Sequence, residues 1–264
     1  MATIGLCRLC RNEAELQDSH FIPKAAYKRV RGEGKNPHPL VVQTDKAFQT
    51  ADQIRAHLLC SDCEQRLSKN GEDTFFQYCY QGKEKFKLLE MLHELNPVVN
   101  NDQYAIYVLP KSDHRIIQQI GYLGVSVLWK SSAHVWKDRD HIVPSIKLGS
   151  LYQEQIRQFL LEKAPFPEYA ALVIEVSDFS NRLISAIGTP GTSKPPTNHL
   201  HWIDLCGIRF NLFIGARMPP QIKLLCVLAS DQKCVLLAKK QEAMMARTYR
   251  EHLSVLAGIR SSHP

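Results

Sequence analysis

The sequence predicts an α+β fold in which a small N-terminal module precedes a larger mixed α/β domain. Two Cys-x-x-Cys pairs, which begin at Cys7 and Cys60, mark the first module. Beyond them, segments with apolar residues at helical spacing occur among short runs of β-branched and aromatic residues typical of strands. No internal repeat is visible along the chain. We therefore expect a module at residues 1–80 and a larger domain at 81–264.

Helices are expected where apolar residues recur at three- or four-residue spacing. The pattern at residues 83–95 ends at an Asn-Pro step, since proline cannot continue a helix. A long helix is predicted to follow Ser112 and to run through Leu128, and its wide apolar stripe indicates a central, buried position. Another helix is expected to begin at Glu64, and two more are expected at residues 150–163 and 239–256.

Strands are expected in the apolar runs between these helices. Residues 200–216 predict a hairpin that turns near Cys206 and Gly207, whereas 188–198 is typical of a loop because Gly, Pro, Ser and Thr are frequent there. The other predicted strands span residues 104–109, 169–176, 222–229 and 233–237.

Cysteine usage and the start of the sequence predict a reduced, cytoplasmic protein. The chain contains eight cysteines, but its opening Met-Ala-Thr-Ile-Gly lacks the basic and apolar regions of a secretion signal. Its longest apolar runs are far shorter than the roughly 20 residues of a membrane helix. Reduced thiols favour metal binding over a disulfide framework.

The charge balance favours an acidic partner. The formal net charge is +7 and the sequence pI is about 9.0. Clustered cations neutralise phosphates and release counterions, which favours nucleic acid, and the alternative is a solvated basic surface. Part of the excess lies early in the chain, at Lys24, Lys28, Arg29, Arg31 and Lys35.

The two cysteine pairs predict a structural zinc site with Cys7, Cys10, Cys60 and Cys63 as ligands, because four thiolates close a tetrahedral zinc shell. In a treble-clef (ββα-metal-like) arrangement, the first pair lies on a hairpin knuckle and the second at the first turn of a helix. The helical pattern after the second pair fits this arrangement. The alternative is that one pair is coincidental or that the thiols are simply buried. Buried free thiols are expected at the four isolated cysteines, Cys79, Cys206, Cys226 and Cys234.

The order of these motifs resembles the metal finger of HNH endonucleases. A Cys-x-x-Cys at residues 7–10 is followed by Ser-His-Phe-Ile-Pro at 19–23 and by Leu-Leu-Cys-Ser-Asp-Cys at 58–63. The family has a Cys-x-x-Cys, an Asp/Glu-His-Ile-x-Pro strand and a Leu-Cys-x-x-Cys helix start in the same order. The resemblance covers about residues 5–70.

The resemblance implies that His20 is the general base that removes a proton from the water attacking a phosphodiester. Glu64 falls where active members keep an Asn or His near the catalytic ion, and its carboxylate suits Mg²⁺ or Mn²⁺. Ser19 stands in place of an acidic or histidine ligand. The middle Asn is not found before Cys60, where Gln53, Arg55 and His57 stand instead. Structural and substrate-contacting roles of His20 therefore stay open.

Three cations after the Ser-His-Phe-Ile-Pro motif, Lys24, Lys28 and Arg29, could bind phosphates of nucleic acid beside the site. The alternative is that they form the exposed face of a short helix.

Two further signals are weaker. Residues 140–144, Asp-His-Ile-Val-Pro, match the strand motif more literally, but no Cys-x-x-Cys follows them, so we expect a surface loop that leads into a short strand. Trp129, His134 and Trp136 could stack on bases, although aromatic residues at the end of an apolar helix are more often part of the core.

Two functions follow from these observations. The first is a zinc-stabilised HNH-like endonuclease, a hydrolase of DNA rather than RNA, of the kind used in bacterial restriction or phage defence. The second is a non-catalytic zinc-finger module that binds nucleic acid or a protein partner. In either case residues 81–264 could bind substrate, a protein partner or a second copy of the chain. An open cleft shared by His20 and Glu64 favours the first function, and burial of His20 favours the second.

Overall fold

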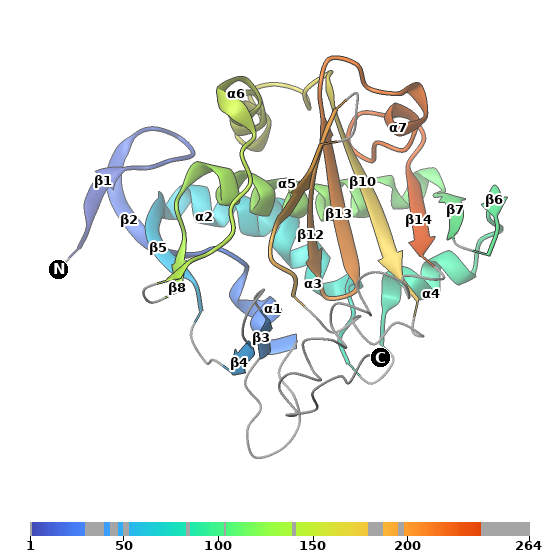
Figure 1. Cartoon of the computed structure of the whole chain (residues 1–264), viewed down its shortest axis with the longest axis horizontal. Coiled ribbons are helices and arrows are strands. Elements are labelled where there is room, and N and C mark those ends of the chain that lie inside the picture. Colours follow the sequence, from blue (N-terminus) through green and yellow to red (C-terminus); the bar gives the residue numbers. More distant parts are fainter. Residues whose placement is uncertain are drawn as a thin grey trace, which may run out of the picture.

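The computed structural model describes residues 2–29, 40–42, 47–49, 53–82, 85–102, 104–138, 141–178, 187–194 and 198–238. Within these ranges the protein is mixed α/β, with a small sheet near the N-terminus and a large sheet formed mainly by the second half of the chain (Figure 1). The expected class is therefore confirmed at the level of mixed helices and sheets.

The small sheet is antiparallel, in the order β1-β2-β5. Its strands are β1 (Ile4–Leu6), β2 (Glu13–His20) and β5 (Arg55–Cys60). The chain between β2 and β5 contains α1 (Lys24–Arg29) and the paired strands β3 (Leu40–Val42) and β4 (Ala47–Gln49). Since β1, β2 and β5 contain the cysteine motifs or adjoin them, their pairing brings residues about 50 positions apart together.

A long helical run follows the small sheet directly. It consists of α2 (Ser61–Leu67), the π-helical turn η1 (Ser68–Glu72) and α3 (Asp73–Tyr78). Gly71 in the π turn is buried against α5 (His114–Ala133), and a Cβ atom there would lie 2.9 Å from the backbone nitrogen of Leu123. The absence of a side chain at Gly71 therefore permits the close approach of the two helices.

The large sheet has seven strands in the order β11-β12-β13-β10-β14-β7-β6. Neighbouring strands are antiparallel except for β10 and β14, which are parallel. β12 illustrates why these residues form strands, because every second side chain from His201 to Leu205 is buried. The bounds are β6 (Val99–Asn100), β7 (Tyr104–Val108), β10 (Ala170–Ser177), β11 (Gly191–Ser193), β12 (His199–Leu205), β13 (Ile208–Ile214) and β14 (Cys234–Ala238).

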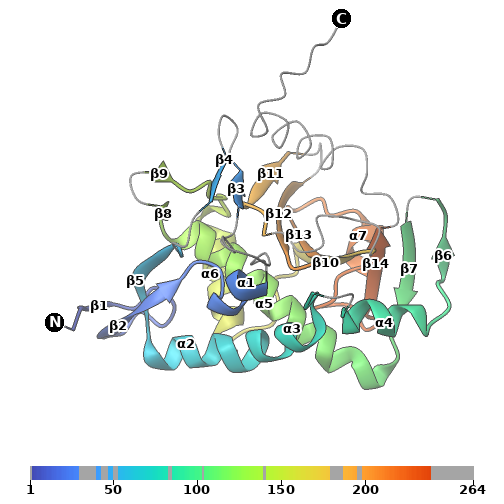
Figure 2. The same cartoon turned by 90° about the horizontal axis from the view of Figure 1, so that it is seen from below.

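Helix α5 connects the two sheets. It begins beside β7, crosses one face of the large sheet and ends near the small sheet (Figures 1 and 2). Gly124 lets it lie directly on the sheet, because a Cβ atom there would lie 2.1 Å from Cδ1 of Phe210. The remaining elements are η2 (Lys111–Asp113), α4 (Lys87–His93), α6 (Gly149–Leu160), α7 (Pro220–Leu224), β8 (Lys137–Asp138) and β9 (His141–Ile142). One continuous cluster of buried residues includes members from both sheets.

Most sequence-based element predictions are confirmed. The expected hairpin turns at Cys206 and Gly207, whose φ angles of 46° and 83° suit a tight two-residue turn. The central helix is present as α5, and Trp129 and Trp136 are core residues with 1% exposure each. The short strand after residue 140 is β9, which pairs with β8.

Two predictions need correction. The strand expected at 222–229 is instead the short helix α7 followed by turns, because proline at the first helical position favours a helix start. The loop expected at 188–198 contains the edge strand β11. The terminal helix predicted at 239–256 lies outside the described residues, and the division of the chain near residue 80 stays a prediction.

Among the described helices, none is both long enough and apolar enough to cross a membrane.

Candidate functional site

The first cysteine pair lies on a tight knuckle between β1 and β2. The carbonyl of Cys7 accepts a 2.8 Å hydrogen bond from the amide of Arg11, and the amide of Cys7 donates a 2.9 Å bond to the carbonyl of Asn12. Arg11 has a φ of 65°, the left-handed conformation that closes the knuckle. These local bonds turn Cys7 and Cys10 toward one point.

The second pair lies where β5 passes into α2. Cys60 is the last residue of the strand and the N-cap of the helix, and Cys63 lies buried in the first helical turn. The amide of Cys60 donates a 3.3 Å hydrogen bond to Sγ of Cys7, which joins the two pairs directly.

The four sulfur atoms form a cluster that could hold a zinc ion. All four Sγ atoms lie within 4.8 Å of one another, and those of Cys10 and Cys60 are 3.8 Å apart. Tetrahedral zinc with Zn–S bonds of about 2.3 Å places its sulfur ligands about 3.8 Å apart. The donor set and its spacing therefore fit a structural zinc site at Cys7, Cys10, Cys60 and Cys63.

Three thiols of the cluster, Cys7, Cys60 and Cys63, differ in how readily they ionise. A hydrogen bond from Cys63, with help from backbone amides, lowers the pKa of Cys7 to about 4. The same contact raises the pKa of Cys63, and burial raises the pKa of Cys60. The cluster thus favours one thiolate beside protonated neighbours, and binding of a divalent metal must release protons.

The other four cysteines are buried free thiols, as expected: Cys79, Cys206, Cys226 and Cys234. None of the eight cysteines forms a disulfide in the described structure.

His20 is the last residue of β2 and lies opposite Arg55 of β5. Its side chain is half-buried, and its imidazole is hydrogen-bonded to the side chain of Gln53. Burial lowers the pKa of His20 below its ordinary value, and the charges of Arg55 and Lys130 act in the same direction. At neutral pH the imidazole is therefore neutral and able to accept a proton.

Ser19 has a structural contact that the sequence does not indicate. Its side chain is buried, and its hydroxyl accepts a 3.1 Å hydrogen bond from the amide of Leu59. The same hydroxyl donates a 3.4 Å bond to the carbonyl of Gln17. Ser19 thus holds β2 against β5. Its exposed neighbour Asp18 pairs with Arg55 at 2.6 Å.

Lys130 of α5 is a second residue that holds the His20 segment. Its side chain is only 2% exposed, and its Nζ donates a 2.9 Å hydrogen bond to the backbone carbonyl of His20. Burial raises the pKa of Glu72, while the charge of Lys130 lowers it and that of Glu64 raises it. The charges of Lys130 and Glu64 therefore act on Glu72, and both acidic side chains are only half-buried.

The structure places His20 and Glu64 in the same region but does not assemble them into a metal shell. Oε1 of Glu64 is buried and has no hydrogen-bond partner among the described residues. Among the described residues, the four cysteines lie close enough together to bind one metal ion as a group. Neither His20 nor Glu64 belongs to a group of three or more metal-ligating side chains there. A catalytic Mg²⁺ or Mn²⁺ ion that takes only one or two protein ligands, with Glu64 among them, stays a prediction.

The three candidate phosphate-binding cations lie on α1. Lys24 and Lys28 are exposed and one helical turn apart. Arg29 folds back, and its Nη2 donates a 3.5 Å bond to the carbonyl of Phe76 in α3. Lys24 and Lys28 therefore remain available for phosphate. Arg31 and Lys35 lie outside the described residues.

The residues that sequence reasoning missed are those that support His20 from other elements. Lys130 is an isolated charge within the apolar stripe of the central helix, which is a detectable signal for an internal contact. Gln53 is one of three residues that stand where the family's Asn is missing, and nothing in the sequence assigned it to the imidazole. In the literal second match, Asp140 and the side chain of His141 lie outside what is described.

Comparisons with models of known protein families, with curated proteins and with solved structures gave no match.

Proposed function

We propose that this protein is a zinc-stabilised relative of HNH nucleases that acts on DNA, with His20 as its general base. The proposal includes a treble-clef assignment for the small sheet, supported by the order knuckle, β2–β5 pair and α2 with the second cysteine pair at its start. The observation that carries the catalytic part is a neutral, hydrogen-bonded imidazole on the strand next to the cysteine cluster.

In the proposed reaction His20 accepts a proton from the attacking water through its free imidazole nitrogen. The oxygen of that water then forms a bond to phosphorus, and the bond to the leaving sugar oxygen breaks. Gln53 orients the imidazole, and Lys130 fixes the backbone of His20. A Mg²⁺ or Mn²⁺ ion held partly by Glu64 would supply positive charge to the phosphate.

Cleavage of plasmid and single-stranded DNA tests this function. We expect zinc-loaded protein to nick DNA in the presence of Mg²⁺ or Mn²⁺, and His20→Ala to lower the rate at least about 100-fold, the usual contribution of a general base. His57→Ala is the matched control, because His57 is exposed on the neighbouring strand β5. Equal rates for wild type and His20→Ala would refute the catalytic role.

A second candidate function is binding without catalysis, to nucleic acid or a protein partner. The buried Oε1 of Glu64 favours it, because that oxygen faces away from solvent. This function predicts DNA binding that weakens when Lys24 and Lys28 are replaced by alanine, with no cleavage under any metal condition. Cleavage that depends on His20 would exclude it.

The cellular setting is part of the proposal. The net charge of +7 supports a nucleic-acid partner, and eight free thiols support a reducing compartment such as the cytoplasm. A role in bacterial restriction or phage defence would follow from DNA cleavage. Binding of a second copy or of a protein partner would involve the larger part of the chain.

A further inference from the structure

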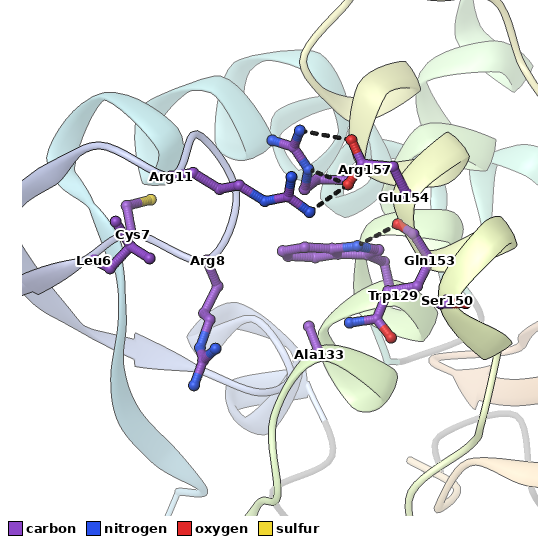
Figure 3. Close-up of a pocket in the computed structure, with 10 residues that line it drawn as sticks. All are labelled: Leu6, Cys7, Arg8, Arg11, Trp129, Ala133, Ser150, Gln153, Glu154 and Arg157. Atoms are coloured by element: carbon purple, nitrogen blue, oxygen red, sulfur yellow. Dashed lines mark hydrogen bonds and ion pairs between the residues drawn. The ribbon is translucent and has the colours of Figure 1, made fainter.

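A cavity of about 280 Å³ lies on the zinc knuckle, separate from the His20 region. Its walls come from the knuckle, from the C-terminal end of α5 and from the start of α6 (Figure 3). The two sites use neighbouring residues of one helix, since Trp129 lines the cavity and Lys130 bonds to the His20 carbonyl. The end of α5 thus separates the two sites.

The cavity has a built charged wall. Arg157 is buried, and it bonds to Glu154 at 2.8 Å and to the carbonyl of Leu9 on the knuckle at 2.5 Å. Arg11 pairs with the same carboxylate at 2.5 Å. Hydrogen bonds from Arg157 and Gln158 lower the pKa of Glu154 to about 2, so this carboxylate is ionised.

Arg8 is the unpaired cation of the cavity. It is exposed, and its guanidinium has no hydrogen bond or ion pair with the described residues. Arg11 and Arg157 both pair with the carboxylate of Glu154, whereas the side chain of Arg8 projects away from it (Figure 3). A planar guanidinium that is free to move is well suited to bind phosphate oxygens.

The floor between the arginines is apolar. Leu6, Ala133 and the indole of Trp129 line it, and Figure 3 shows the indole ring lying between Arg11 and Ala133. The indole is only 1% exposed and its N–H is bonded to the carbonyl of Gln153 at 3.1 Å, so the accessible apolar surface includes Leu6, which is 58% exposed. The volume is near the lower limit of small-molecule pockets, about 300 Å³, which admits one small unit of a larger molecule.

We propose that this cavity binds the phosphate monoester of a single nucleotide unit. A monoester carries a charge close to −2 above a pH of about 6, and its oxygens suit the planar guanidinium of Arg8. Arg8 and Arg11 contact the phosphate oxygens, and the sugar lies against the apolar floor. The inference deepens the proposed action on DNA, because it adds a contact to the 5′-phosphorylated end of a strand. A free 5′-mononucleotide carries the same chemistry and is the other source of such a group.

Calorimetric titration of the full-length, zinc-loaded protein tests the proposal with defined probes. The probes are thymidine, thymidine 5′-monophosphate, and a short oligonucleotide with a 5′-phosphate or a 5′-hydroxyl. We expect both phosphorylated probes to bind more tightly than their unphosphorylated partners. Tighter binding of the oligonucleotide than of the mononucleotide identifies a strand end, and the reverse identifies a free nucleotide.

Substitutions locate the binding to the cavity. Arg8→Ala should weaken binding of the phosphorylated probes about tenfold, the scale of one charge-assisted hydrogen bond, without loss of folding because its side chain supports no other residue. Arg217→Ala is the matched control, since Arg217 is also exposed but lies on the loop after β13. Equal affinity in Arg8→Ala, or an equal loss in Arg217→Ala, would overturn the proposal, as would equal affinity for 5′-phosphate and 5′-hydroxyl ends.

His134 supplies an independent readout. Burial and then the charge of Arg8 lower the pKa of His134, so a phosphate bound at Arg8 should raise it toward its ordinary value. An NMR titration with and without thymidine 5′-monophosphate measures this shift. The same experiments in His20→Ala should give unchanged binding. If cleavage is lost while phosphate binding is kept, the phosphate site in the cavity still stands. If DNA is cleaved without a preference for 5′-phosphate, the phosphate site is refuted and the proposed nuclease activity is not.

Discussion

The small sheet and the large sheet differ in what holds them together. In β1 the side chains of Ile4 and Leu6 are 62% and 58% exposed, whereas β10 of the large sheet is buried along nearly its whole length. The small sheet has a cysteine cluster where the large sheet has interlocked apolar side chains. Stability at the N-terminal end should therefore depend on metal and thiol ionisation, and stability of the large sheet on packing.

The difference also concerns the candidate sites. His20, Gln53, Arg8 and Arg11 all belong to the small sheet and its loops. The buried cations that position them belong to the other part: Lys130 of α5 bonds to His20, and Arg157 of α6 bonds to the knuckle. A sheet with little core of its own presents the reactive groups, and a rigid neighbouring helix layer fixes their backbone.

The largest expected effect is loss of the small sheet when a zinc ligand is removed. Structural zinc contributes roughly 10–16 kcal/mol in small modules, so Cys60→Ser should unfold residues around the knuckle and α2. Zinc content by mass spectrometry and hydrogen exchange of β2 and β5 measure the effect. Cys234→Ala, outside the cluster, should retain one zinc ion. Retention of zinc and of exchange protection in Cys60→Ser would contradict the role of the metal.

A packing change in the other region should be smaller and should spare the metal. Gly124→Ala places a methyl group against Phe210, and such overpacking costs about 1–3 kcal/mol or somewhat more. Urea unfolding of the large sheet should show this loss. Gln118→Ala, on the same helix but only partly buried, should change the unfolding free energy by less than about 0.5 kcal/mol. Loss of zinc from Gly124→Ala would show that the two regions do not differ as described.

Acid should destabilise the large sheet through His201. Burial, together with His199, lowers the pKa of His201 to about 4, and the ordinary value is about 6.5. Because the unfolded chain binds the proton more tightly, stability is lost as the pH falls below 6.5, by up to about 3 kcal/mol near pH 4. His201→Leu should flatten this part of the pH dependence, measured by urea unfolding at several pH values. His93→Leu, at an exposed site, should leave the slope unchanged, and an unchanged slope in His201→Leu would contradict the assignment.

The smallest expected effect is at the surface contact between the two regions. Arg66 of α2 pairs with Glu162 after α6, and their side chains are 37% and 59% exposed. Exposed pairs contribute about 0–1 kcal/mol, so a double-mutant cycle with Arg66→Gln and Glu162→Gln should give a coupling energy within that range. A larger coupling would mean that surface charges, in addition to α5, join the two regions.

Local patterns accounted for much of the fold and for the metal ligands. In each Cys-x-x-Cys pair, a knuckle or a helix turn brings the two cysteines together. The alternating or helical spacing of apolar residues indicates which face of a strand or helix is buried. The hairpin at Cys206 and the central helix were therefore predictable. The segment at 222–229 was not, because its apolar residues suited both a strand and a short helix, and the preceding prolines decided in favour of the helix.

The sequence by itself determined the four cysteines of the candidate zinc site, the alternation of helices and strands and the position of His20 on the strand beside that cluster. Only the tertiary structure decided which distant side chains support that histidine, and that three arginines share one cavity on the knuckle. The physical reason is range: a motif encodes contacts made within a few residues, whereas Lys130 reaches His20 across 110 positions because helix α5 packs between the two sheets.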